Sequence, residues 1–394
     1  MWEWDKLEVG GTGLPAALPP ADPPPHPRPT GSNPIRPTRH PMRAFRTRVL
    51  CAALTGAAAL TLALPHALEA QSVRQSGRSD AGMVSAAHPL ATDAGVRMLE
   101  LGGNAADAAV AAAFAIAIVE PTMNSIAGRT QVLVATPEGQ FHGIDGTTQA
   151  PWDYDADTAP QASYGYPVIG VPGAVAGLLK LHEEHGTLPL DVLMEPAIEY
   201  AENGFRLLVG DALRMMGGSE QALEFPGTRK AYYRDDGSAY GPGEILRQPD
   251  YANTLRRIRD GGREAFYEGD IAEQMIADLQ ANGSVMSMQA LRDYVAEDSR
   301  IVRGSYRGYD LIGTDVPAAG VLAIQALQIM ENFEPAEMSE AEWFAVTGQA
   351  LGMARGELRV LGTDTAAERA TSKDYARRLA DEILSLIHIS EPTR

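Results

Sequence analysis

The stretch from Ala105 to Val119 constrains this chain more than any other, because nearly every residue in it is Ala, Val, Ile or Phe. A helix that is apolar on every side belongs in the interior of a fold. Asn104 can cap its first turn, and Asp107 can accept hydrogen bonds from the exposed amides there. Asp107 and Glu120 bracket a stretch shorter than the roughly 20 residues that cross a bilayer. The sequence therefore predicts a buried central helix and not a membrane span.

Regular elements flank this helix on both sides. Residues 91–101 place apolar side chains about one helical turn apart and predict a helix, which Gly102-Gly103 ends. After Pro121, the small residues of 124–130 predict a turn. Residues 131–135 and 140–145 alternate in polarity around Pro137-Glu138-Gly139 and predict a two-stranded hairpin. Helices and strands together indicate an α/β (α+β) fold.

The rest of the chain alternates helices, short strands and turns. Residues 166–171 predict a strand, a glycine turn at 170–173 leads into a helix at 174–185, and Gly204 ends a helix at 191–203. The glycine-rich segment 215–243 predicts loops and short hairpins. Beyond it we expect helices at 251–260, 270–282, 287–294, 318–332, 343–359 and 373–383, and strands at 300–307 and 309–314.

Several segments resemble, in the same order, the large subunit of γ-glutamyltransferase (glutathione hydrolase) precursors. They are 102–109 (GGNAADAA), 126–130 (IAGRT), 144–145 (ID), 171–177 (VPGAVAG), 252–255 (ANTL), 265–269 (AFYEG) and 306–309 (YRGY). The resemblance runs over residues 83–383. It implies the αββα sandwich of N-terminal-nucleophile hydrolases, incomplete here because strands of a small subunit are missing.

The visible chain carries no catalytic centre of its own. It has no G-x-S-x-G motif and no pair of carboxylates that its context singles out. The resemblance implies a precursor that cleaves itself and a small subunit whose new N-terminal Thr attacks a γ-glutamyl amide, with its own α-amine as base. That Thr is expected downstream of residue 394. The implied substrate is glutathione-like or another acyl amide, the implied partner is the protein's own small subunit, and no cofactor or metal is implied.

The resemblance assigns this chain to substrate recognition. Most relatives carry an Arg after the Ile-Asp strand end, in a segment like I-D-F-R-E, which holds the substrate's α-carboxylate. Here Thr147 stands in place of that Arg and Thr148 in place of the Glu, while Arg129 is new to the preceding loop. We expect Arg129, Thr147 and Thr148 to bind substrate. The alternatives are a surface or salt-bridged guanidinium at Arg129 and a hydroxyl-capped turn at the threonines, which Asp145 would hold.

The two ends of the chain differ from its middle. Residues 1–41 are rich in proline and glycine and predict disordered or mis-started sequence, and 42–70 pair arginines with an apolar run typical of a signal peptide. A single membrane anchor is the alternative. Residues 71–82 predict a linker, and 384–394 (LSLIHISEPTR) resembles translated adapter sequence that we expect to lie outside the fold. The sequence thus predicts a periplasmic or secreted protein, and the sole cysteine, Cys51, falls in the signal segment.

Composition excludes some partners and leaves other functions open. A net charge of −18 and a pI near 4.9 argue against nucleic acid and anionic membranes, and we expect no stable membrane association beyond the signal segment. The turn at 170–173 lacks the phosphate-binding spacings, and His182 with His185 falls one residue short of a zinc motif. Two alternative functions stay open: a family member that binds small acids without turnover, and a helical scaffold.

Overall fold

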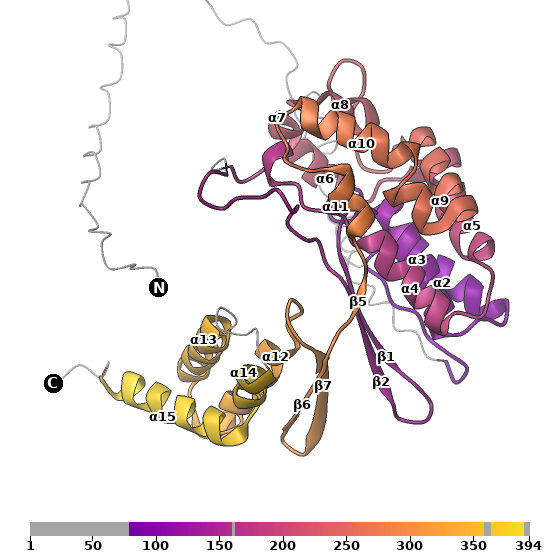
Figure 1. Ribbon diagram of the computed structural model, residues 1–394. Helices are drawn as coiled ribbons and strands as arrows, with labels where there is room; N and C mark the ends of the chain where they lie inside the picture. The colour runs from indigo at the N-terminus through magenta and orange to yellow at the C-terminus, as the bar shows by residue number, and fades with distance from the viewer. Residues whose placement is uncertain (1–78, 160–161, 358–363, 390–394) are drawn as a thin grey trace, which may run out of the picture. The chain divides into compact units, whose positions relative to one another are not determined.

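The computed structural model describes residues 79–159, 162–357 and 364–389, and the buried helix α3 (Ala105–Val119) organises them (Figure 1). The predicted bounds and cap of α3 are confirmed. The Asn104 Oδ1 atom accepts from the amides of Ala106 at 2.8 Å and Asp107 at 3.1 Å, while Asp107 Oδ2 accepts from the Asn104 amide at 2.8 Å. Helix α2 (Pro89–Glu100) packs along α3, and His88 caps it by accepting from the Leu90 amide at 3.1 Å.

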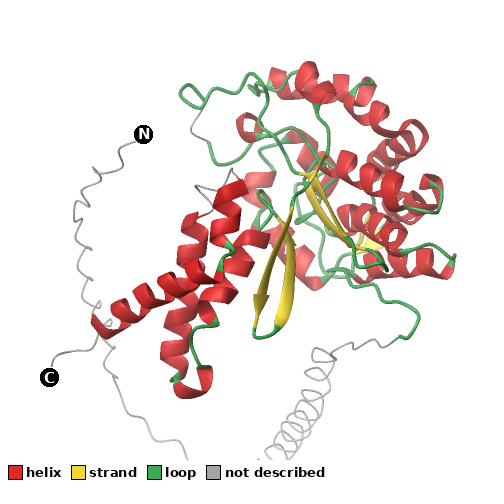
Figure 2. Ribbon diagram, turned by 60° about the horizontal axis from the view of Figure 1, so that its bottom comes forward, coloured by secondary structure: helices red, strands yellow, loops and turns green. Residues whose placement is uncertain are grey.

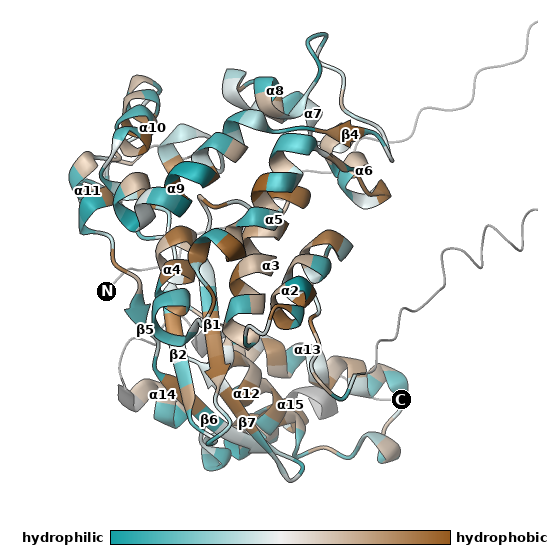
Figure 3. Cartoon of the chain, turned by 90° about the vertical axis from the view of Figure 1, so that its right-hand side faces the viewer, coloured by the Kyte–Doolittle hydropathy of each residue, from teal (hydrophilic) through white to brown (hydrophobic). Residues whose placement is uncertain are grey.

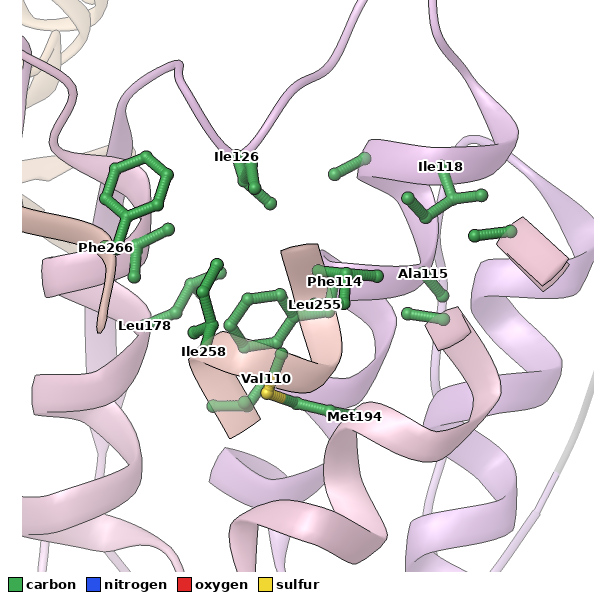
Figure 4. Close-up of a cluster of buried hydrophobic side chains, with 14 of the residues drawn as sticks. Val110, Phe114, Ala115, Ile118, Ile126, Leu178, Met194, Leu255, Ile258 and Phe266 are labelled. Atoms are coloured by element: carbon green, nitrogen blue, oxygen red, sulfur yellow. The ribbon is translucent and has the colours of Figure 1, made fainter. Parts of the chain in front are cut away.

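Helices α4 (Ala174–His185), α5 (Leu190–Asn203) and α9 (Pro249–Tyr267) complete the layer around α3. Their inner faces supply apolar side chains that meet those of α3 in one continuous core (Figure 4). The residues at its centre are Val110, Phe114, Ile118, Leu178, Met194, Leu255, Ile258 and Phe266. Full burial of each large side chain is worth about 1.5–3 kcal/mol, so this layer is the main source of stability for the region.

A small antiparallel sheet lies against α4 (Figure 3). Its strands are β1 (Thr130–Ala135), β2 (Phe141–Gly146) and β5 (Glu297–Asp298), in the order β1-β2-β5. Strands β1 and β2 form the predicted hairpin, with Thr130 opposite Gly146 and Ala135 opposite Phe141. Gly139 turns the chain with a φ of 79°, a conformation that favours glycine.

Asp107 joins the start of α3 to the loop after α4. Its side chain is fully buried; Oδ1 accepts from the amides of Thr187 at 2.9 Å and Leu188 at 3.1 Å, and Oδ2 accepts from the Thr187 hydroxyl at 2.6 Å. Burial raises the pKa of Asp107, but these hydrogen bonds and the one from the Asn104 amide outweigh it and leave the pKa below its ordinary value. The carboxylate is therefore charged in the folded protein and fixes the helix layer behind the sheet.

The other elements of this part of the chain pack around the helix layer. They are the 3-10 helix η1 (Tyr166–Val168), β3 (Phe205–Arg206), α6 (Val209–Gly217), α7 (Ser219–Ala222), α8 (Pro226–Tyr232), β4 (Ile245–Leu246), α10 (Asp270–Ala281) and α11 (Met288–Asp293). Strands β3 and β4 pair antiparallel.

The last described elements have their own apolar clusters. Strands β6 (Ile301–Tyr306) and β7 (Tyr309–Thr314) form a hairpin against α12 (Gly320–Met330) (Figure 2). After η2 (Pro335–Glu337), helices α13 (Glu340–Glu357) and α15 (Lys373–Ile389) pack on α12, joined by α14 (Asp364–Ala370). Among the described residues, no helix combines the length and apolar character needed to cross a bilayer.

Some secondary-structure predictions for the middle of the chain were wrong. Residues 166–171 form no strand: η1 begins there, and only Val171 makes a single β-bridge, to Gln149. Segment 215–243 contains α7 and α8 where loops were expected. Pro226 starts α8 at its first position, where its missing amide hydrogen costs nothing. Helix α9 continues past the predicted end at Asp260, through a break at Gly262 with a φ of 59°.

The predictions for the two ends of the chain have different outcomes. Helix α15 runs to Ile389, past its predicted end at Ile383, and so includes residues 384–389 of the segment 384–394 that was expected to lie outside the fold; residues 390–394 are not among those described. The segments 1–41 and 42–70, and most of the linker 71–82, lie outside the described residues.

Candidate functional site

The candidate site residues meet where the β1–β2 hairpin opens. Thr130, the first residue of β1, pairs with Gly146, the last residue of β2. Arg129 precedes the first and Thr147 follows the second, so the antiparallel register places both at the same end of the hairpin. The structure thus brings Arg129 and Thr147 together at one end of the hairpin. Thr148, the third candidate residue, comes directly after Thr147 in the sequence.

The N-terminus of α4 holds this end of the hairpin. The Gly128 carbonyl accepts from the amides of Gly173 at 2.9 Å and Ala174 at 3.0 Å, so the first amides of the helix bond to protein backbone. A side chain at Gly173 would collide with the Gly146 carbonyl oxygen and the Tyr294 hydroxyl. The turn at 170–173 therefore packs a helix closely onto a strand end, as predicted, and glycine is required for that approach.

Two stacked tyrosines clamp the same backbone from the interior. The Tyr294 hydroxyl donates to the Thr147 carbonyl at 2.6 Å, and the Tyr267 hydroxyl donates to the Pro172 carbonyl at 2.8 Å and accepts from the Ala176 amide at 3.3 Å. The two rings are nearly parallel, with centroids 5.7 Å apart. Burial raises the pKa of both phenols, so both stay protonated and available as donors.

Asp145 shapes the turn that presents Thr147. Its Oδ1 atom accepts from the Thr147 amide at 2.9 Å and from the side-chain amide of Gln131 on the neighbouring strand. A carboxylate that bonds the amide two residues on is an Asx turn. This confirms the interpretation that Asp145 holds the turn.

The side chains of the three predicted residues differ in their surroundings. Arg129 is exposed and makes no hydrogen bond or ion pair with any residue that the structure describes, so the salt-bridge alternative finds no partner in that part of the chain. Thr147 is half-buried and Thr148 is exposed. Thr148 lines a cavity of about 470 Å³. A role for each in substrate binding stays a prediction.

Sequence reasoning missed the tyrosine clamp. Tyr294 lies 147 residues from its partner Thr147, and Tyr267 lies 91 residues from Ala176, so no local pattern connects them. Tyr267 does fall in the AFYEG segment that carried the resemblance, which was the only available signal. Tyr251, a half-buried tyrosine, accepts from the Ile126 amide at 3.0 Å and fixes the loop before Arg129.

The two histidines near the end of α4 have separate environments. The His182 Nε2 atom lies 2.9 Å from the Leu188 carbonyl, whereas the His185 ring lies 5.2 Å from the His142 ring on β2. Among the described residues, no group of three or more His, Cys, Asp or Glu side chains is placed to hold a metal ion.

Comparison with known proteins relates this fold to one family. The family model described as gamma-glutamyltranspeptidase matches residues 91–392. A glutathione hydrolase proenzyme from Pseudomonas sp. (strain A14) is 32% identical over 267 residues, which are 65% of this chain and 46% of that protein. An acylase ACY 1 proenzyme from Pseudomonas sp. (strain V22) is 32% identical over 329 residues, 79% of this chain and 59% of that protein.

Solved structures agree with the sequence comparison. The crystal structure of Helicobacter pylori gamma-glutamyltranspeptidase superposes with a TM-score of 0.74 at 29% identity, covering 81% of this chain and 94% of that one. The α/β fold of N-terminal-nucleophile hydrolases is therefore confirmed. The chain spans about half the length of the curated relatives it matches. The chain belongs to the gamma-glutamyltranspeptidase family.

Proposed function

We propose that this chain is the large-subunit part of a precursor that hydrolyses or transfers acyl groups from γ-glutamyl amides, such as glutathione, or from related acyl amides. The observation that carries the proposal is the family match over residues 91–392, which includes the hairpin end at Arg129 and Thr147. The relatives' names support it, because they describe a glutathione hydrolase and an acylase, both as proenzymes. The same names argue against the alternative function, in which the protein binds small acids but catalyses no reaction.

The proposed reaction divides its tasks between two subunits. An N-terminal Thr, released by self-cleavage on a small subunit, attacks the amide carbonyl through its hydroxyl oxygen. Its α-amine takes the hydroxyl proton and delivers a proton to the departing amine, which leaves an ester on the Thr. Water or an acceptor amine then releases the acyl group. The present chain contributes recognition, and its partner is the small subunit.

The proposed recognition relies on the hairpin end that α4 and the tyrosines hold in place. Arg129 offers an exposed guanidinium that can pair with a substrate carboxylate, while Thr147 and Thr148 offer hydroxyls. A neutral hydrogen bond contributes roughly 1 kcal/mol, against about 1.5–3 kcal/mol for a charged one. With Thr147 in the usual arginine position, selectivity for the γ-glutamyl group therefore depends on Arg129.

The activity is tested with the complete reading frame. Purified protein is assayed with γ-glutamyl-p-nitroanilide and with acyl-p-nitroanilides, beside calorimetry with glutamate. Release of p-nitroaniline from either substrate class supports the proposal. Binding of glutamate without any release by the complete protein would replace it with the binding-protein alternative.

We also propose that residues 42–70 direct export to the periplasm or medium and are then removed. The arginine-flanked apolar run supports this, and the acidic composition supports a protein with no further membrane association. N-terminal sequencing after cell fractionation tests it. A cytoplasmic protein, or a membrane-bound one that keeps residues 42–70, would contradict it.

A further inference from the structure

An uncharged cavity opens beside Thr148. Its volume is about 470 Å³, within the roughly 300–1,000 Å³ of small-molecule sites. Tyr154, Val168, Ile169 and Val285 line it from three separate stretches of chain, and none of its lining residues is charged.

These four side chains are unusually exposed for their type. Tyr154 is 46%, Val168 45%, Ile169 39% and Val285 40% exposed. Single exposed apolar residues are common on protein surfaces, but four that converge on one concave site form a binding surface. The cavity thus offers apolar contact area that no described residue covers.

The walls of the cavity are fixed to each other and to the candidate site. Gln149 and Val171 exchange backbone hydrogen bonds of 3.3 and 2.8 Å, which join the wall that contains Thr148 to the wall that contains Val168 and Ile169. Thr148 itself follows Thr147, whose carbonyl the Tyr294 hydroxyl holds. The cavity is therefore continuous with the end of the hairpin.

We propose that this cavity receives an uncharged, apolar acyl group of the amide substrate, an aliphatic chain or an aromatic ring seated beside Thr148. The inference rests on the proposed function and narrows its substrate class. A γ-glutamyl group carries an ammonium and a carboxylate, and moving either into a site without a charged lining residue costs desolvation that neutral hydrogen bonds from Thr148 or Gln149 repay only in part. An apolar acyl group gains contact area at no such cost, which agrees with Thr147 standing in place of the usual arginine.

Binding is measured by calorimetry with phenylacetamide on the complete protein, whether or not it has cleaved itself. We expect binding by the wild type and a loss of about tenfold or more in Val168→Asp, because the new carboxylate places charge in the cavity. Val209→Asp, an equally simple change at a valine that is 62% exposed on α6 outside the cavity, is the matched control. It should bind like the wild type.

Kinetics give the second readout. In the cleaved enzyme, we expect kcat/KM for phenylacetyl-p-nitroanilide to exceed that for γ-glutamyl-p-nitroanilide, and Val168→Asp to reduce this ratio about tenfold or more while Val209→Asp leaves it unchanged. No binding of phenylacetamide, or equal binding by both variants, would overturn the inference. A wild type that binds phenylacetamide but never cleaves itself would instead defeat the proposed function and leave the cavity assignment standing.

Discussion

Replacing Asp107 should unfold the junction between α3 and the loop after α4. Its two carboxylate oxygens accept four hydrogen bonds, from the amides of Asn104, Thr187 and Leu188 and from the Thr187 hydroxyl. Asp107→Ala leaves three backbone donors without an acceptor in a site where the side chain is fully buried. Each such donor costs about 1–3 kcal/mol, and water that enters the gap recovers part of this. We expect the free energy of unfolding to fall by about 3–5 kcal/mol.

Asp107→Asn removes the negative charge of the side chain but keeps its size and shape. Its amide nitrogen must replace either Oδ1, opposite two backbone donors, or Oδ2, opposite one backbone donor and a hydroxyl that can turn. The second orientation is better and still orphans the Asn104 amide, so we expect a loss of about 2–4 kcal/mol. Asp93→Ala, at an exposed position on the neighbouring helix α2, is the control and should stay within about 0.5 kcal/mol.

The assay is urea unfolding followed by circular dichroism, at several pH values. Hydrogen bonds hold the pKa of Asp107 below its ordinary value of 3.8 although burial raises it, so its stabilisation is present above that value and is lost as the pH falls through the lower folded-state pKa. The gap between wild type and Asp107→Asn should therefore shrink in acid. A loss in Asp107→Ala no larger than in Asp93→Ala, at neutral pH, would refute this reasoning.

Three further changes test the site and its supports. Gly173→Ala should disturb the end of the hairpin and lower both the stability and the substrate affinity of the protein. In the control Gly348→Ala, the added side chain meets nothing within 4 Å and should stabilise α13 by up to about 1 kcal/mol. Thermal unfolding of both variants checks this. Arg129→Ala should raise KM for α-carboxylate substrates about tenfold, and Arg292→Ala, also exposed, should not; equal constants would place Arg129 among surface residues. Burial lowers the pKa of His88, against the charges of nearby carboxylates, so stability should fall as the pH drops below about 6.5, and His88→Asn should flatten that dependence in a pH series of unfolding measurements.

Local sequence patterns correctly predicted the helices and strands that are determined by the residues within them. Helix α3 has the predicted bounds, because the capping residue, the apolar run and Pro121 are all contained in one stretch. The β1–β2 hairpin follows likewise from alternation around a turn with Gly139. The error at 166–171 has a physical cause: Pro167 cannot donate to a strand ladder, and among the described residues only Val171 of this segment pairs with another, Gln149.

The candidate site was predictable only in part. Asp145 was correctly interpreted, because an Asx turn is encoded within three residues. The clamp of Tyr267 and Tyr294 was not, because it joins segments that only the folded chain brings together. The uncharged cavity beside Thr148 was missed for the same reason, since its walls come from three separate stretches.

The most direct test of this account is the intact mass of the protein expressed from its complete reading frame, with N-terminal sequencing of each product. We expect two chains, the second of which begins with a Thr that was internal to the precursor, and a single chain when that Thr is replaced by Ala. One uncleaved wild-type chain, or a second chain that begins with any residue unable to act as a nucleophile, would contradict it.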